Sequence, residues 1–541
     1  MKRCEKIMRT AVSGILVAGL SCTIVGCQGQ GAQTNTRSTP ASSAQKQSHE
    51  QRGLSTQQNG MYAAETEEGF YSCVDEPIDF NTEDYAAFAE NGFISTASRP
   101  LSTFSSDVDT ASYCNLRRMI NEGRNSNDVP SGAVRIEEML NYFDYSYASP
   151  KGDDLFGVDV EMGACPWNKD TALLVMGFST ADEVKATRGR NLVFLIDSSG
   201  SMSSSDKLPL LQDSFSVLAG DLGADDRVSI VTYSGSEKVL ARGVPGNEHQ
   251  RILQAIDGIE AHGSTNGEAG LTMAYDLAEQ YYIEGGVNRI ILASDGDLNV
   301  GKTSTSDLND YVSEKRKTGI YLSVLGFGTG NYKDTKMEVL ADNGNGNYHY
   351  IDCKEEAMRV FDEKLSANLV PLADDVKLQV EFNPAQVKAY RLIGYENRAM
   401  ADADFNNEAA DAGEVGPNSQ FTVAYEIVPV DSAMEIDVPQ LKYENSFAGG
   451  VSSDEWLTCS MRYKMIDGRS AEQKVSVSEK DYSSRPGADW AFAASVIECG
   501  MLLCDSEYAG DATWRGAVSL AESSAGNDAR RNEFVSLMKS L

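Results

Sequence analysis

The chain has 541 residues, a formal net charge of −33 and an apolar fraction of 41%. This length allows about three or four domains, and the apolar fraction is ordinary for globular proteins. The strong negative charge argues against binding to nucleic acid and against electrostatic binding to anionic lipid.

Residues 1–26 have the pattern of an export signal. Four basic side chains within residues 2–9 precede an apolar segment, residues 11–25, that is too short to span a bilayer comfortably. The segment ends in Ile24-Val25-Gly26-Cys27, which resembles a bacterial lipobox. The resemblance implies that Cys27 is lipidated and anchors the mature chain on the extracytoplasmic side of a bacterial membrane. An ordinary secretory signal with an incidental cysteine, or a short membrane anchor, is the alternative.

Residues 27–93 are predicted to be a flexible tether followed by an acidic linker. Residues 28–59 are mostly Gln, Ser, Thr, Gly and Ala, a composition that buries too little apolar surface to fold. Because no apolar segment of about 18 residues follows the signal, we expect the rest of the chain to be soluble.

Residues 94–187 are predicted to form a helical lead-in followed by two β-strands. The expected elements are a strand that begins near Arg99, helices over 113–122 and 136–143, and strands over 155–162 and 171–179. Asp107 and Asp109 indicate either a second cation site or the solvent-facing side of an alternating strand, and we favour the strand.

Residues 188–368 alternate between apolar strands and helices. Strands are predicted over 192–196, 227–233, 289–295, 320–327 and 348–351, and helices over 208–222, 248–259, 268–282, 307–316 and 355–366. This order predicts an α/β fold with a doubly wound, mostly parallel sheet. Ligands of such sheets bind at the carboxyl ends of the strands.

Five oxygen-bearing side chains follow these strands. Asp197, Ser199 and Ser201 alternate in the turn after the first strand, Thr265 lies in a Gly-Ser-Thr-Asn-Gly loop, and Asp295 ends a later strand. A carboxylate with hydroxyls suits a hard divalent cation such as Mg²⁺. For the first turn alone, a Ser/Gly-rich connection that caps the next helix explains the residues equally well.

The three segments, in this order, resemble the metal-ion-dependent adhesion site of von Willebrand factor type A (VWA) domains. The resemblance implies that Ser199 and Ser201 bind Mg²⁺ directly, with Mn²⁺ or Ca²⁺ as alternative ions. It implies that Thr265, Asp197 and Asp295 bind directly or through water. An acidic side chain of a protein partner would complete the coordination shell. No covalent bond is broken in such a site, so we expect a binding or adhesion protein and not an enzyme.

The resemblance to VWA domains covers residues 191–366. Residues 102–113 and the C-terminal helices resemble the flanking regions of a bacterial subfamily of exported VWA proteins. A scaffold for envelope assembly, in which the metal is structural, is one alternative function. A second alternative rests on residues 296–303, which match the Gly-x-x-x-x-Gly-Lys-Thr pattern of a phosphate-binding loop. Asp297 would repel a phosphate there, so we give nucleotide binding little weight.

The C-terminal part changes character. Residues 369–482 are predicted to be an antiparallel β-sandwich, with strands over 376–382, 421–427 and 457–463, and the strands of residues 155–179 are candidates for the same sandwich. Residues 483–541 are predicted to be helical over 488–501 and 515–541.

Cysteine content indicates no zinc site. The chain has no Cys-x-x-Cys pair and only four histidines. Seven cysteines remain after the lipidated one, an odd number that leaves at least one thiol unpaired within the chain. They are Cys73, Cys114, Cys165, Cys353, Cys459, Cys499 and Cys504. We expect Cys499 and Cys504 to be buried helix residues and not a bridge.

Overall fold

The computed structural model describes residues 82–181, 188–296, 305–361, 372–436, 453–465 and 468–541. The export signal, Cys27, Cys73 and the tether lie outside these residues, as does most of the phosphate-loop pattern. Within the described ranges, no helix is long and apolar enough to cross a bilayer. The six cysteines of these ranges all have free thiols.

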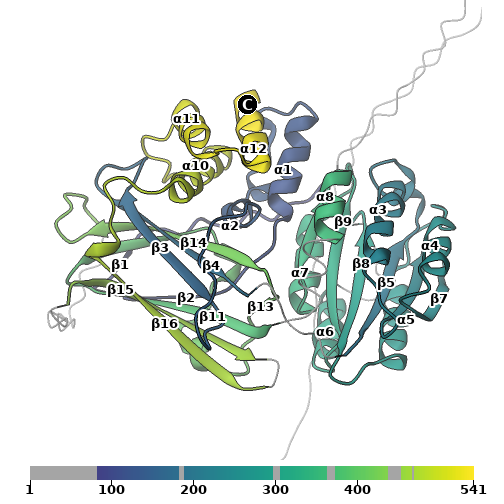
Figure 1. The fold of residues 1–541 in the computed structure, drawn as a ribbon. Coiled ribbons are helices and arrows are strands. Elements are labelled where there is room, and N and C mark those ends of the chain that lie inside the picture. Colours follow the sequence, from purple (N-terminus) through teal and green to yellow (C-terminus); the bar gives the residue numbers. More distant parts are fainter. Residues whose placement is uncertain (1–81, 182–187, 297–304, 362–371, 437–452, 466–467) are drawn as a thin grey trace, which may run out of the picture. The chain divides into compact units, whose positions relative to one another are not determined.

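A six-stranded sheet carries the candidate metal ligands (Figure 1). Its strands, in spatial order, are β10 (Tyr348–Ile351), β9 (Tyr321–Phe327), β8 (Val287–Ser294), β5 (Arg190–Asp197), β6 (Arg227–Tyr233) and β7 (Glu237–Pro245). All neighbours are parallel except β6 and β7. The predicted mostly parallel α/β sheet is confirmed. Strand β7 was not predicted, because its half-exposed edge carries charged residues and lacks a continuous apolar run.

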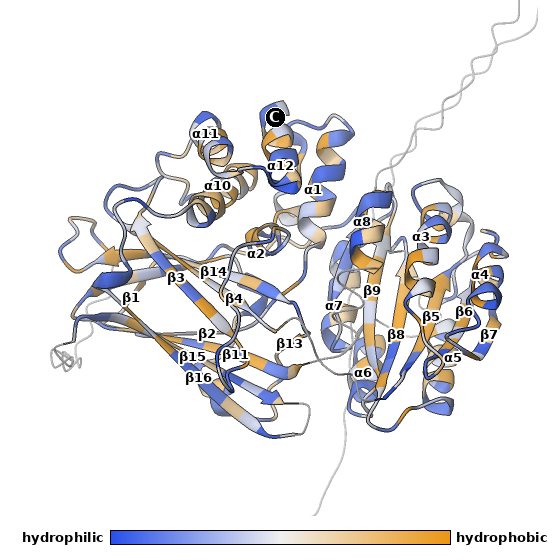
Figure 2. Cartoon of the chain, viewed as in Figure 1, coloured by the Kyte–Doolittle hydropathy of each residue, from blue (hydrophilic) through white to orange (hydrophobic). Residues whose placement is uncertain are grey.

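Helices cover both faces of this sheet, which explains why β5 is apolar throughout. Side chains alternate across a strand, so Val193 and Leu195 belong to one core and Phe194 to the other. Figure 2 shows the hydrophobic colouring along β5 and β8. The first core is shared with α5 (Gly267–Gln280), α6 (Thr305–Arg316) and α7 (Asp334–Asn343), and the second with α3 (Leu208–Gly220), α4 (His249–Asp257) and α8 (Lys354–Arg359).

The other strands form two antiparallel sheets that share one apolar core. One sheet has the order β1 (Ile94–Ser95), β12 (Val387–Ile393), β14 (Gln420–Pro429), β4 (Ala172–Ser179) and β3 (Gly157–Ala164). The other has β13 (Gly413–Val415), β11 (Ala373–Phe382), β15 (Glu455–Met465) and β16 (Ser470–Ser478), with β2 (Leu101–Ser105) also paired to β11. Strand β4 precedes the α/β sheet in the sequence and β14 follows it, and these two strands pair. The sandwich is therefore built from segments before and after the α/β sheet in the sequence.

Five helices pack beside the sandwich: α1 (Ala111–Asn121), α2 (Ile136–Asn141), α10 (Ala488–Leu503), α11 (Trp514–Ser524) and α12 (Ala529–Ser540). The predicted helical region over residues 515–541 consists of two helices, α11 and α12, with a turn between them. Gly526 adopts a left-handed conformation with φ of +59°, and Asp528 then caps α12 by accepting a hydrogen bond of 2.8 Å from the Arg531 N–H. The break therefore has a local cause, a glycine followed by an N-cap.

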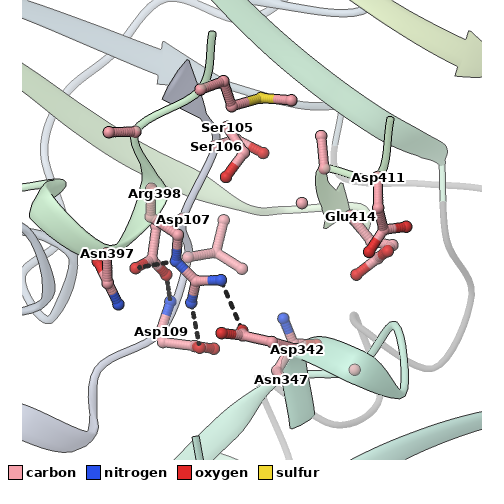
Figure 3. A pocket seen from close by; sticks show the side chains of 16 residues that line it. Ser105, Ser106, Asp107, Asp109, Asp342, Asn347, Asn397, Arg398, Asp411 and Glu414 are labelled. Atoms are coloured by element: carbon pink, nitrogen blue, oxygen red, sulfur yellow. Dashed lines mark hydrogen bonds and ion pairs between the residues drawn. The ribbon is translucent and has the colours of Figure 1, made fainter. Parts of the chain in front are cut away.

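Asp107 and Asp109 do not face solvent, so the alternating-strand interpretation is wrong. Both are 3% exposed and bind the guanidinium of Arg398 (Figure 3). Nε of Arg398 lies 3.1 Å from Asp107, Nη2 lies 3.2 Å from Asp109, and Nη1 lies 2.5 Å from Asp342 on α7. In the described structure, these two aspartates bind the guanidinium of Arg398. Because Arg398 also pairs with Asp342 on α7, it connects the lead-in to the α/β sheet.

A second arginine joins the same elements. Arg135, just before α2, pairs with Glu138, with Asp334 at 2.7 Å and with Glu338 at 3.1 Å. Together, Arg135 and Arg398 contact six carboxylates, so this buried junction carries excess negative charge. Burial, together with the negative charges of Glu138 and Asp342, raises the pKa of Glu338 to about 8 against the opposing effect of the two arginines.

This raised pKa predicts a loss of stability with increasing pH. Unfolded, Glu338 would titrate near its ordinary value of 4.5, whereas folded it keeps its proton up to a pH of about 8. Between these values the folded state binds more protons, so its stability falls as pH rises. We expect urea midpoints of the wild type to fall across this window, and those of Glu338→Gln to fall less steeply. Glu479→Gln, at an exposed site, is the control; equal slopes for all three proteins would contradict the assignment.

Candidate metal centre

Asp197 is the last residue of β5, at the carboxyl edge of the sheet. Its Oδ1 accepts a hydrogen bond of 2.8 Å from the Ser199 N–H, and its Oδ2 accepts one of 3.2 Å from the Ser294 hydroxyl. The side chain is fully buried. The first contact closes a tight turn after the strand, and the second comes from the neighbouring strand β8, so both oxygens are fixed in place.

Ser199 and Ser201 present their hydroxyls side by side. Their Oγ atoms are 2.9 Å apart. Adjacent ligands of an octahedral Mg²⁺ with bonds of 2.0–2.1 Å lie about 3 Å apart, so this spacing fits two coordination positions. Ser199 is buried whereas Ser201 is exposed. One edge of the site therefore faces solvent.

The loop that contains Thr265 is hydrogen-bonded to this turn. The Gly200 N–H donates to the Gly263 carbonyl at 3.1 Å, and the His262 N–H donates to the Ser198 carbonyl at 2.8 Å. Thr265 follows two residues later and is half-buried, directly before the N-cap of α5. The two backbone bonds bring this loop to the same edge of the sheet as Asp197.

Asp295 follows β8 and is fully buried. Its Oδ2 accepts hydrogen bonds from Lys207 Nζ at 3.0 Å and from Asn331 Nδ2 at 3.2 Å. Lys207 is itself 5% exposed and also donates to Asn331 Oδ1 at 3.0 Å. Strand β8 pairs with β5 up to Ala293 opposite Ile196, so the two aspartates follow neighbouring strand ends.

Sequence reasoning missed Lys207 and Asn331. Lys207 lies directly before α3, at the end of a serine-rich turn, and Asn331 follows a Gly-x-Gly turn. Neither has a periodic or motif signal, and their contacts to Asp295 span 88 and 36 residues of sequence. Only the fold brings them to the site.

The donor set fits a divalent cation on charge as well as on spacing. Burial, together with the negative charge of Asp295, raises the pKa of Asp197 to about 6. Lys207 pairs with Asp295, and a divalent cation would compensate the remaining charge of the two buried carboxylates. Carboxylate and hydroxyl oxygens are the donors that Mg²⁺ prefers.

A second cluster in the described ranges has the composition of a metal site but is already paired. Ligand atoms of Cys114, Asp352 and Glu356 lie within 4.8 Å of one another. Arg117 lies 2.6 Å from Asp352 and 3.0 Å from Glu356, and Arg359 lies 2.7 Å from Glu356. Since two guanidinium groups balance the two carboxylates, this cluster is an ion-pair junction between α1 and α8.

Comparison with known families agrees with this fold. The model described as "von Willebrand factor type A domain" matches residues 191–364, and one described as "von Willebrand factor" matches residues 79–175. The chain is therefore a VWA-domain protein. The model "Uncharacterized protein YfbK, C-terminal" matches residues 367–541. YfbK of Escherichia coli (strain K12) is 37% identical over 468 residues, which cover 85% of this chain and 81% of YfbK. The chain belongs to the YfbK family.

More distant relatives and solved structures match only part of the chain. Inter-alpha-trypsin inhibitor heavy chain H4 of Sus scrofa is 33% identical over 156 residues, which are 27% of this chain and 17% of that protein. The solved structure of a von Willebrand factor type A protein from Catenulispora acidiphila is 15% identical with a TM-score of 0.41, covering 71% of this chain and 89% of that one. VWA domains generally mediate protein–protein interaction, and proteins that carry them are generally not enzymes.

Replacing Lys207 with Met should make stability depend on a divalent cation. The variant removes the ammonium from a buried carboxylate, which costs about 3 kcal/mol when one partner of a buried pair is lost. We expect Mg²⁺ to raise the urea midpoint of Lys207→Met more than that of the wild type. Lys238→Met, on the exposed part of β7, is the matched control. An equal response to Mg²⁺ in all three proteins would show that Lys207 and the ion do not act on the same charge.

Proposed function

We propose that the chain is an envelope lipoprotein whose VWA region binds a protein partner through a divalent cation, with Mg²⁺ as the first choice. The ligands would be Asp197, Ser199, Ser201, Thr265 and Asp295. The observation that supports this most is the pair of hydroxyls 2.9 Å apart beside a fully buried carboxylate. The exposed Ser201 marks the side from which a partner would reach the ion.

The proposed partner presents an acidic side chain. The chain carries a net charge of −33, so an acidic partner would be repelled unless a local positive charge reverses the field. A bound divalent cation supplies that charge at one point. A carboxylate that enters its open position gains a short, charge-assisted contact with defined geometry. The metal would therefore set both affinity and specificity.

Capture of the partner should require the metal and both hydroxyls. We expect the mature protein to retain a partner from envelope extracts in Mg²⁺ and to release it in EDTA. The double variant Ser199→Ala/Ser201→Ala should lose both Mn²⁺ binding in calorimetry and partner capture. Ser204→Ala/Ser205→Ala, in the same turn, is the matched control and should behave as wild type.

Thermal unfolding of the same proteins separates adhesion from a structural metal. If the ion mediates binding, EDTA abolishes capture while the protein stays folded at the assay temperature. Partner capture that survives EDTA would contradict the proposal. Loss of the fold in EDTA would favour the envelope scaffold with a structural ion instead.

The proposed membrane anchor is the lipid on Cys27. Metabolic labelling with a radioactive fatty acid should mark the wild-type chain and leave Cys27→Ser unlabelled, because the thiol is the attachment atom. Cys22→Ser is a close control, since it removes a thiol five residues away within the signal. Label retained in Cys27→Ser, or lost in Cys22→Ser, would contradict this anchor.

A further inference from the structure

A separate cavity lies away from the proposed metal ligands. It has a volume of about 260 Å³ and is bounded by the segment before β1, the start of α2 and the turn after β12. Its walls combine apolar and acidic side chains. The apolar ones include Ala86, Phe88, Val134 and Ile136, and the acidic ones are Glu90, Glu137 and Glu396.

Glu137 is the most unusual of these residues. It is only 1% exposed, and its Oε2 atom is buried without a hydrogen-bond partner. A Cβ atom at Gly394 would lie 2.4 Å from this oxygen, so a glycine is what lets the carboxylate sit against the backbone there. A buried carboxylate oxygen without a partner is costly, and it needs a proton or a cation to offset that cost.

Within the described part of the chain, the three glutamates of this cavity are not neutralised by an ion pair. None of Glu90, Glu137 and Glu396 forms an ion pair within the described ranges. Arg135 also lines the cavity, but its guanidinium pairs with Glu138, Asp334 and Glu338. Burial raises the pKa of Glu137 well above its usual range, and the charge of Glu396 adds to the shift. Glu137 therefore holds its proton while the cavity is empty, and a cation that enters the cavity can replace that proton.

We infer that this cavity binds an organic cation, a primary ammonium on an alkyl stem, with Glu137 and Glu396 as its counter-charges. The three glutamates are not among the described groups whose ligand atoms lie within 4.8 Å of one another, so they do not form a compact cage for a metal ion. Spaced carboxylates with apolar walls suit a ligand with a methylene chain. The volume lies below the range of about 300–1,000 Å³ for drug-sized ligands, which points to a small amine or a lysine side chain.

Calorimetry with 1,5-diaminopentane tests this assignment directly. The mature protein, kept in EDTA so that the proposed metal centre does not contribute, should bind the diamine saturably. It should not bind 1-pentanol, which has the same stem without the charge. Glu137→Gln has the shape of the protonated side chain but cannot become a carboxylate, so we expect this variant to fold. Its affinity for the diamine should fall at least about tenfold, the effect of losing one charge-assisted contact.

Two further proteins keep the test decisive. Glu396→Gln, at a half-buried site, should weaken binding in the same way, whereas the exposed Glu479→Gln should leave it unchanged. No saturable binding by the wild type, or equal binding by Glu137→Gln and the wild type, would overturn the inference. Competition by Ca²⁺, tested without EDTA, at a concentration below that of the diamine would also overturn it, because the site would then prefer a metal ion. The diamine titrations in EDTA do not depend on the metal centre.

Discussion

Burial of two carboxylates at neighbouring strand ends is the constraint on which the account of this protein depends. Asp197 and Asp295 are both inaccessible to water, so each carboxylate carries the full electrostatic cost of burial. The parallel pairing of β5 and β8 forces them to the same edge of the sheet. Lys207 offsets one charge from within the chain. A divalent cation bound at this edge would compensate the remaining negative charge.

Clusters of buried carboxylates occur elsewhere in the chain, and their negative charge is neutralised in a different way in each cluster. At the junction of the lead-in with α7, Arg135 and Arg398 hold six carboxylates, and protonation of Glu338 relieves part of the repulsion. Between α1 and α8, Arg117 and Arg359 balance Asp352 and Glu356. Acidic clusters in this protein are therefore not equivalent. The carboxylates that no arginine pairs with are the candidates for binding an external cation.

The sequence predicted best the parts of the fold that have strong local signals. Buried parallel strands such as β5 are continuous apolar runs, and the helices between them have a clear period, so the α/β sheet could be derived residue by residue. Edge strand β7 and helix α7 have mixed, polar sequences whose burial is decided by their neighbours. The helix break at Gly526 has a local signal that was available, a glycine followed by a capping aspartate. This signal does not by itself predict a break, because the segments on both sides of it are helical.

For the metal centre, the motif residues could be found in the sequence but their supporting contacts could not. The alternation of Asp197, Ser199 and Ser201 is a pattern within five residues. The Lys207 and Asn331 contacts join distant segments and leave no such pattern. The ion pairs of Asp107 and Asp109 could not be predicted for the same reason. Their partner Arg398 lies about three hundred residues away in the sequence, and only the folded chain brings it close.

The most direct measurement is a crystal structure of the mature protein grown with Mn²⁺, with the ion located by its anomalous scattering. The account predicts one strong peak within coordination distance of the Ser199 and Ser201 hydroxyls, at the edge of the sheet that holds Asp197 and Asp295. A peak elsewhere, or an ordered Lys207 contact at Asp295 with no ion beside the two serines at saturating Mn²⁺, would contradict it.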